Sequence, residues 1–91
     1  MTVTVTSESA MVETRDRLVV SPVHGRVELV GPISYTAEGE FVRAEQVIAR
    51  VASDGQHVEV FAPCDAWVMG HVVRDGQRVE PGTAIVHLRA V

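Results

Sequence analysis

Four histidines and one cysteine are the side chains of this sequence with the most potential for chemistry: His24, His57, His71, His87 and Cys64. An imidazole binds metals or transfers protons, and a thiolate can act as a nucleophile. No two of these histidines lie within four residues of each other, the spacing that puts two ligands together on one strand or helix. We therefore expect no metal site and no catalytic residue, with the histidines at ordinary strand or surface positions.

A pocket that contains Cys64, His71 and His87 is the alternative hypothesis. It would make the chain a small enzyme or ligand-binding protein with polar groups converging in a concave site. Cys64 has no basic neighbour in the sequence that would activate its thiol, and a free cysteine in a small domain commonly behaves as a buried apolar side chain. The sequence therefore favours an inert thiol.

The sequence contains no lysine. Its Lys+Arg total of 8 is made up entirely of arginines, namely Arg15, Arg17, Arg26, Arg43, Arg50, Arg74, Arg78 and Arg89. Without a lysine, no side chain of the sequence can form a Schiff base or carry an amide-linked prosthetic group. We expect no covalently attached cofactor.

Net charge and cysteine content narrow the class of protein further. The net charge of −4 and the lack of a basic stripe argue against nucleic-acid binding. A single cysteine permits no internal disulfide, which is typical of a reducing compartment. Neither a secretory leader nor a long apolar run is visible, so we expect a cytoplasmic protein without membrane contact.

The elements that must position these residues are organised around Asp54-Gly55. This dipeptide favours a type I′ turn, in which both central residues have positive φ, between strands predicted at 46–52 and 57–61. Val58 and Val60 alternate with polar residues, as in a half-buried strand. Further strands are predicted at 18–20, 26–30, 66–73 and 84–88, with short extended pieces at Val42 and Val79 and no helix. Residues 1–16 are expected to form a flexible arm before one domain at 17–91.

An internal repeat relates the two halves of the chain. Ser21–Val27 corresponds to Ala62–Val68, which pairs His24 with Asp65, at corners that need not be close in space. Glu38–Val42 corresponds to Asp75–Val79 at a smaller offset, so the first half has extra residues within 29–37, where we expect a loop. Stacking two related halves would cover the apolar face that each exposes alone.

The order of these motifs resembles the biotinyl/lipoyl domain family. The residues that carry the resemblance are Ser-Pro-x-x-Gly-x-Val from Ser21, Glu-Gly-x-x-Val from Glu38, Ala-Pro-x-Asp-x-x-Val from Ala62 and Asp-Gly-x-x-Val from Asp75. The resemblance implies an all-β barrel-sandwich hybrid of two four-stranded antiparallel sheets related by a pseudo-twofold axis. It also implies a tip position for biotin- or lipoate-bearing lysine, which here is Gly55. Ala66 replaces the usual glycine of the family.

This resemblance without its lysine implies a degenerate carrier domain that is unmodified, non-catalytic and active through protein contacts. The implied partner is a carboxylase-, acyl-transfer- or dehydrogenase-type assembly. The family's corresponding loop lies beside the tip, so the candidate contact residues are Ile33, Tyr35, Asp54, Gly55, Gln56 and His57. A homodimer that buries Trp67 or the N-terminal arm is a further hypothesis.

Overall fold

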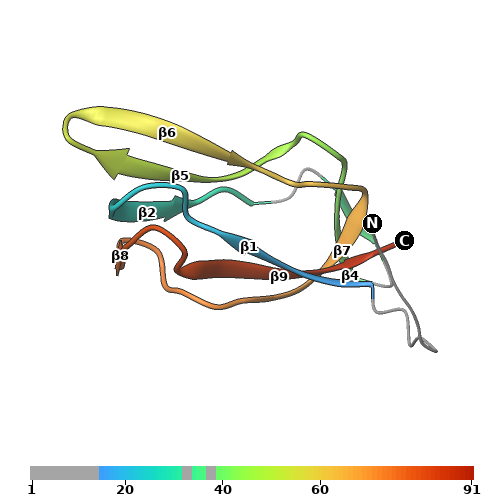
Figure 1. The fold of residues 1–91 in the computed structure, drawn as a ribbon. Coiled ribbons are helices and arrows are strands. Elements are labelled where there is room, and N and C mark those ends of the chain that lie inside the picture. Colours follow the sequence, from blue (N-terminus) through green and yellow to red (C-terminus); the bar gives the residue numbers. More distant parts are fainter. Residues whose placement is uncertain (1–14, 32–33, 37–38) are drawn as a thin grey trace, which may run out of the picture.

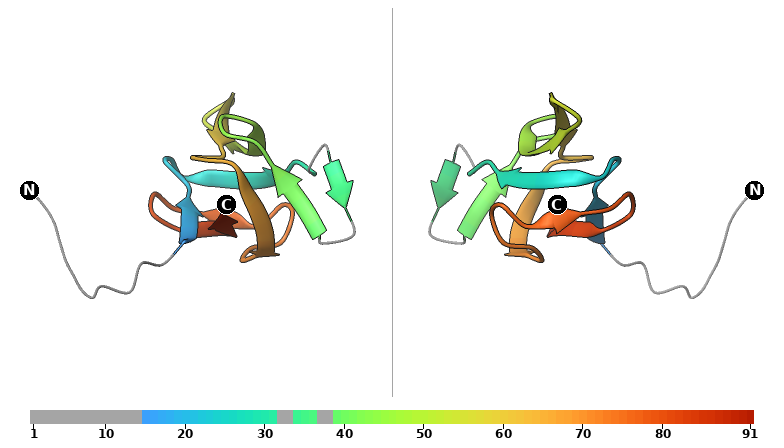
Figure 2. Two further views of the ribbon diagram at one scale, coloured as in Figure 1. Left: turned by 90° about the vertical axis from the view of Figure 1, so that its right-hand side faces the viewer. Right: turned by 90° about the vertical axis from the view of Figure 1, so that its left-hand side faces the viewer.

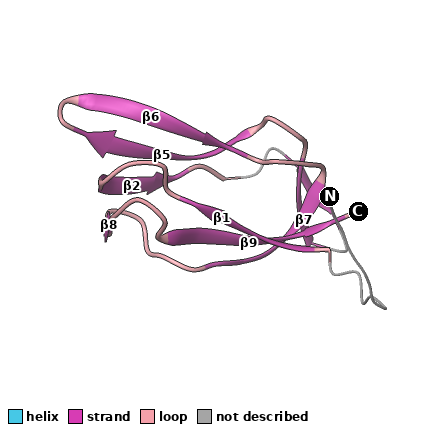
Figure 3. Ribbon diagram, in the orientation of Figure 1, coloured by secondary structure: helices cyan, strands magenta, loops and turns pink. Residues whose placement is uncertain are grey.

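A computed structural model of the chain describes residues 15–31, 34–36 and 39–91. The described residues form strands and loops without a helix (Figure 3), so none of these residues belongs to a helix that could span a membrane. The strands are β1 (Asp16–Val20), β2 (Gly25–Leu29), β3 (Ser34–Thr36), β4 (Gly39–Val42), β5 (Val47–Ser53), β6 (Gln56–Phe61), β7 (Ala66–His71), β8 (Arg78–Val79) and β9 (Ala84–Ala90).

Two antiparallel sheets pack as a sandwich (Figure 1). One sheet has the order β1-β9-β7-β4-β3 and the other has the order β6-β5-β2-β8. The predicted all-β sandwich is confirmed, and the strands lie close to their predicted positions. β3 adds a fifth strand to the first sheet, at the edge opposite β1 (Figure 2).

β3 corrects the sequence prediction, which treated the extra residues as a loop. Tyr35 pairs with Glu40 and Thr36 pairs with Gly39, so the extra segment forms a hairpin with β4. Ser, Tyr and Thr suit a pleated strand, but three residues are too few to show alternation in the sequence. Ile33 lies outside the described residues.

The internal repeat is a repeat of structure. Exchanging the halves places β1 on β6, β9 on β5, β7 on β2 and β4 on β8, which reproduces the order of four strands in each sheet. The alternation of buried and exposed residues along β5 is the same, position by position, along β9. The backbone N–H of Ser21 donates to the carbonyl of Thr83 at 2.9 Å, and that of Ala62 donates to the equivalent Gln46 at 2.8 Å.

The core lies between the sheets and is built mainly from valine and other β-branched or small side chains. These fit a thin sandwich because they pack closely on pleated surfaces. Its most completely buried large members are Val27, Val42, Val51, Val79, Ile85 and Leu88.

Candidate functional site

The β5–β6 turn has the conformation that the sequence predicts. Ser53 pairs with Gln56, and between them Asp54 and Gly55 have φ values of 52° and 81°. Two positive φ values in a two-residue loop define the type I′ geometry. Asp54, Gly55, Gln56 and His57 are all exposed, and a Cβ on Gly55 would meet no atom within 4 Å. The tip is therefore an accessible turn of fixed backbone geometry.

His24 contacts this tip, a feature that the sequence analysis missed. Its Nε2 lies 3.3 Å from Oδ2 of Asp54, with both side chains largely exposed. The repeat had linked His24 with Asp65, but Asp65 accepts a hydrogen bond from the Ala44 backbone N–H at 2.7 Å. The contact follows from the pairing of β2 with β5, for which the sequence gives no local signal.

Tyr35 lies on a different part of the molecule from the tip. Its strand, β3, pairs with β4, and β4 in turn pairs with the start of β7. This end carries the C-terminus, whereas the β5–β6 turn lies at the opposite end (Figure 1). The structure therefore does not bring the tip and Tyr35 together.

The structure does not bring the three residues of the alternative pocket together, although His71 and His87 lie at neighbouring positions of the paired strands β7 and β9. Cys64 is partly buried and packs against the core just before β7, and His71 is exposed at the far end of the same strand. His87 lies half-buried on β9, opposite Gly70. Within residues 15–31, 34–36 and 39–91 no pocket forms, and no three His, Cys, Asp or Glu side chains converge as metal ligands.

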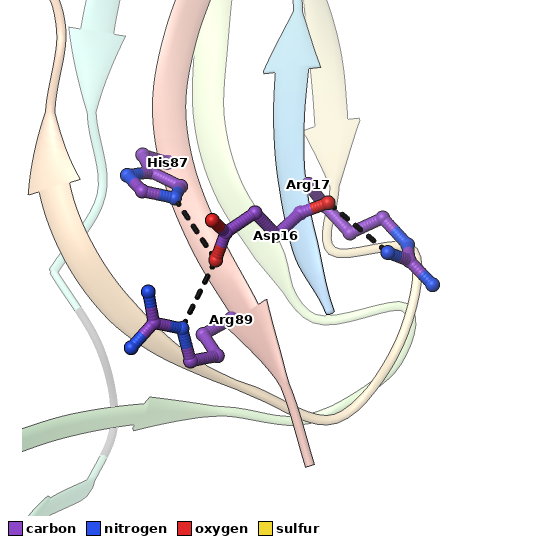
Figure 4. Close-up of polar contacts among 4 residues, drawn as sticks. All are labelled: Asp16, Arg17, His87 and Arg89. Atoms are coloured by element: carbon purple, nitrogen blue, oxygen red, sulfur yellow. Dashed lines mark hydrogen bonds and ion pairs between the residues drawn. The ribbon is translucent and has the colours of Figure 1, made fainter. Parts of the chain in front are cut away.

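A polar cluster that the sequence analysis did not identify joins β1 to β9 (Figure 4). Nε of Arg89 donates to Oδ1 of Asp16 at 3.0 Å, and Nε2 of His87 lies 3.4 Å from the same oxygen. The hydrogen bond from Arg89, supported by that from His87, lowers the pKa of the Asp16 carboxyl from its usual 3.8, although desolvation acts in the opposite direction. The cluster lies on an open sheet face, where it can stabilise the edge strand or take part in a contact.

No protein-family model matches the chain, and no curated protein matches it. Among solved structures, it is similar to part of a single-chain, multi-domain long-chain acyl-CoA carboxylase, with a TM-score of 0.71 and 14% sequence identity. The similarity covers 91% of this chain and 8% of the carboxylase chain. The chain thus has the fold of a small segment within a much longer protein.

Proposed function

We propose that this chain is an unmodified, non-catalytic domain of the biotinyl/lipoyl type that acts through protein contacts in a carboxylase- or acyl-transfer-type assembly. The fold similarity to a segment of a multi-domain carboxylase supports the carrier-type scaffold. The observation that carries the proposal is the exposed Asp54-Gly55 turn in a sequence without lysine.

The chemistry of attachment leads to the unmodified state. In the resembled family, biotin or lipoate is joined by an amide to a lysine at the tip, and the equivalent residue here is Gly55. No lysine elsewhere in the 91 residues can replace it. The turn is well defined without an attached group, since Asp and Gly accept positive φ at low cost.

The tip residues Asp54–His57 are the proposed principal contact surface. They are exposed, and a fixed turn loses little conformational entropy when a partner binds. Ile33 and Tyr35 are further proposed contact residues, and Tyr35 lies away from the tip. The partner class is a subunit of a carboxylase, acyltransferase or dehydrogenase assembly, and we place this assembly in the cytoplasm, in agreement with the single cysteine.

The intact mass of the protein tests the unmodified state. After co-expression with a biotin ligase and, separately, with a lipoate ligase, we expect the mass of the bare polypeptide. A lysine-bearing carrier domain in the same cells is the positive control for each ligase. An added biotinyl or lipoyl mass on this chain would contradict the proposal.

Affinity purification from the native host tests the assembly. The wild-type chain should co-purify with a carboxylase, acyltransferase or dehydrogenase subunit. The double variant Gln56→Ala/His57→Ala should recover about ten-fold less of this subunit, because loss of an important interface side chain typically weakens the binding free energy by about 1.4 kcal/mol or more. The pair Ile33→Ser and Tyr35→Ser tests the further contact residues in the same way. Glu59→Gln, on β6 beyond the tip, is the matched control. Recovery of no such subunit, or equal recovery by all variants, would reject the proposed surface.

A further inference from the structure

The outer face of the β1-β9-β7-β4 sheet carries an apolar surface. Val42, Ala66 and Leu88 face the core and are buried, so the residues next to them along each strand, Phe41, Trp67 and Arg89, face outward. Register places Asp16 beside Arg89, Arg89 beside Trp67 and Trp67 beside Phe41 across four strands. Leu18 lies beside His87 in the neighbouring row. We call this set of residues, together with Met69, the outer A face.

Large apolar side chains dominate the outer A face. Leu18 is 63% exposed, and Met69, in the bulge of β7, is 46% exposed. The rings of Phe41 and Trp67 pack edge to face, with centroids 5.0 Å apart and an interplanar angle of 70°. The solvent side of an antiparallel sheet is normally polar, and contiguous apolar groups there mark interaction sites.

The internal repeat provides a control within the same molecule. The Phe41–Trp67 pair corresponds to Arg78–Arg26 on the other sheet, and both pairs are neighbours on adjacent strands. Leu18, opposite His87, corresponds to Glu59, opposite Arg50, where Nε of Arg50 lies 3.7 Å from Oε2 of Glu59. Met69 corresponds to Glu28. The same backbone positions thus carry charges on one sheet and apolar groups on the other.

The fold itself therefore does not require apolar residues at these positions. Equivalent strands are stable with Arg26, Arg78 and Glu59 exposed to solvent. Apolar side chains at these four positions, where the other sheet has charged ones, indicate that this face is covered by protein.

The charges of the outer A face are matched to each other. Asp16 binds Arg89 at 3.0 Å, so these two opposite charges compensate each other within the outer A face, although the chain as a whole carries −4. The net negative charge of the chain therefore does not oppose contact between two copies at this pair of residues. Both charges are half-exposed, so a twofold pair can place Asp16 of one copy opposite Arg89 of the other.

We propose that a second copy of this chain covers the outer A face, forming a twofold dimer in which two sheets pack face to face. Sheet faces with protruding apolar side chains pack in this way about 10 Å apart. A chain of 91 residues buries only a modest share of its surface alone, so association through Leu18, Met69 and Trp67 adds apolar burial. The dimer uses a surface distinct from the tip of the proposed function.

Sedimentation velocity and light scattering of the full chain over a range of concentrations test the dimer. The wild type should have twice the monomer mass of 9.9 kDa. Leu18→Glu and Met69→Glu introduce the residue type found at the equivalent positions of the other sheet, and each should raise the dimer dissociation constant at least about ten-fold. Phe61→Glu, an apolar residue 49% exposed on the other sheet, is the matched control and should remain dimeric. Circular dichroism verifies that each variant is folded.

Trp67 gives a second measurement because it is the one tryptophan of the sequence. Its emission should shift to longer wavelength when the wild type is diluted and should be independent of concentration in Leu18→Glu. A wild type that is monomeric at all concentrations, or a dimer that persists in both glutamate variants, overturns the proposal. So does a monomer that dimerises only after removal of residues 1–14, since the arm would then be the occupant. Gln56→Ala/His57→Ala should leave the mass unchanged, which separates this test from that of the proposed function.

Discussion

His24 lies 3.3 Å from Asp54, so the turn between β1 and β2 contacts the tip of the β5–β6 hairpin. The residue after His24, Gly25, makes this approach possible. Its φ is 151°, and a Cβ at this position would collide with the carbonyl oxygen of Ala52. The close approach of β2 to β5 next to the tip thus depends on a residue without a side chain.

Gly25→Ala should strongly destabilise the protein. The added methyl group has no space, and the backbone conformation is unfavourable for alanine, so we expect a loss of about 3 kcal/mol or more in the free energy of unfolding. Gly70→Ala is the matched control, because a Cβ there meets no atom within 4 Å and its φ is not positive; its effect should remain within about 0.5 kcal/mol. Urea unfolding measures both, and similar losses would contradict the packing at Gly25.

Gly55→Lys restores the residue type that the resembled family has at the tip. Space is not limiting, since a Cβ at Gly55 meets no atom within 4 Å, but its φ is 81°. We expect a cost of about 1 kcal/mol in the free energy of unfolding from the left-handed backbone alone. Gln56→Lys adds the same charge at the neighbouring strand position and should cost less than about 0.5 kcal/mol. Equal costs in urea unfolding would show that the turn does not retain its positive φ.

Asp16→Asn should destabilise the protein at neutral pH and much less in acid. The pKa of the Asp16 carboxyl is lowered in the folded state, mainly by the hydrogen bond from Arg89. A lowered carboxyl pKa contributes stability that is fully present above the usual value of 3.8 and is lost as the pH falls through the folded-state value.

Thermal unfolding of wild type and Asp16→Asn between neutral pH and a pH of about 2.5 measures this difference, which should shrink in acid. Arg89→Gln removes the main partner, so the effects of the two substitutions should be less than additive in the double variant. A difference that is constant with pH would rule out the Asp16–Arg89 hydrogen bond as the source of stability.

Features encoded in adjacent residues were predictable from the sequence. Asp54-Gly55 specifies its turn through local backbone preferences, and the alternation of Val58 and Val60 specifies the buried side of β6. β3 could not be predicted, because three residues show no period and the strand exists through its pairing with β4. The Asp16–Arg89 bond joins residues 73 positions apart, and only the sheet order brings them together.

The candidate site follows the same division. The tip residues Asp54–His57 could be selected from the sequence because they are consecutive, with a two-residue turn leading directly into β6. The placement of Tyr35 at the opposite end and the contact of His24 with Asp54 both depend on strand pairings between distant segments. The interpretation of Trp67 needed its neighbour Phe41 and the equivalent arginines of the other sheet.

The pseudo-twofold relation places the end of β9 where the other half has its hairpin tip. The backbone N–H of Ala90 donates to the carbonyl of Arg15 at 2.8 Å, so these two residues are already hydrogen-bonded neighbours. A short loop could join Ala90 to Arg15, and new chain ends could be made by opening the hairpin turn between Asp54 and Gly55. Such a circularly permuted polypeptide should assemble the same layers in a new connectivity, with its free ends at the former tip.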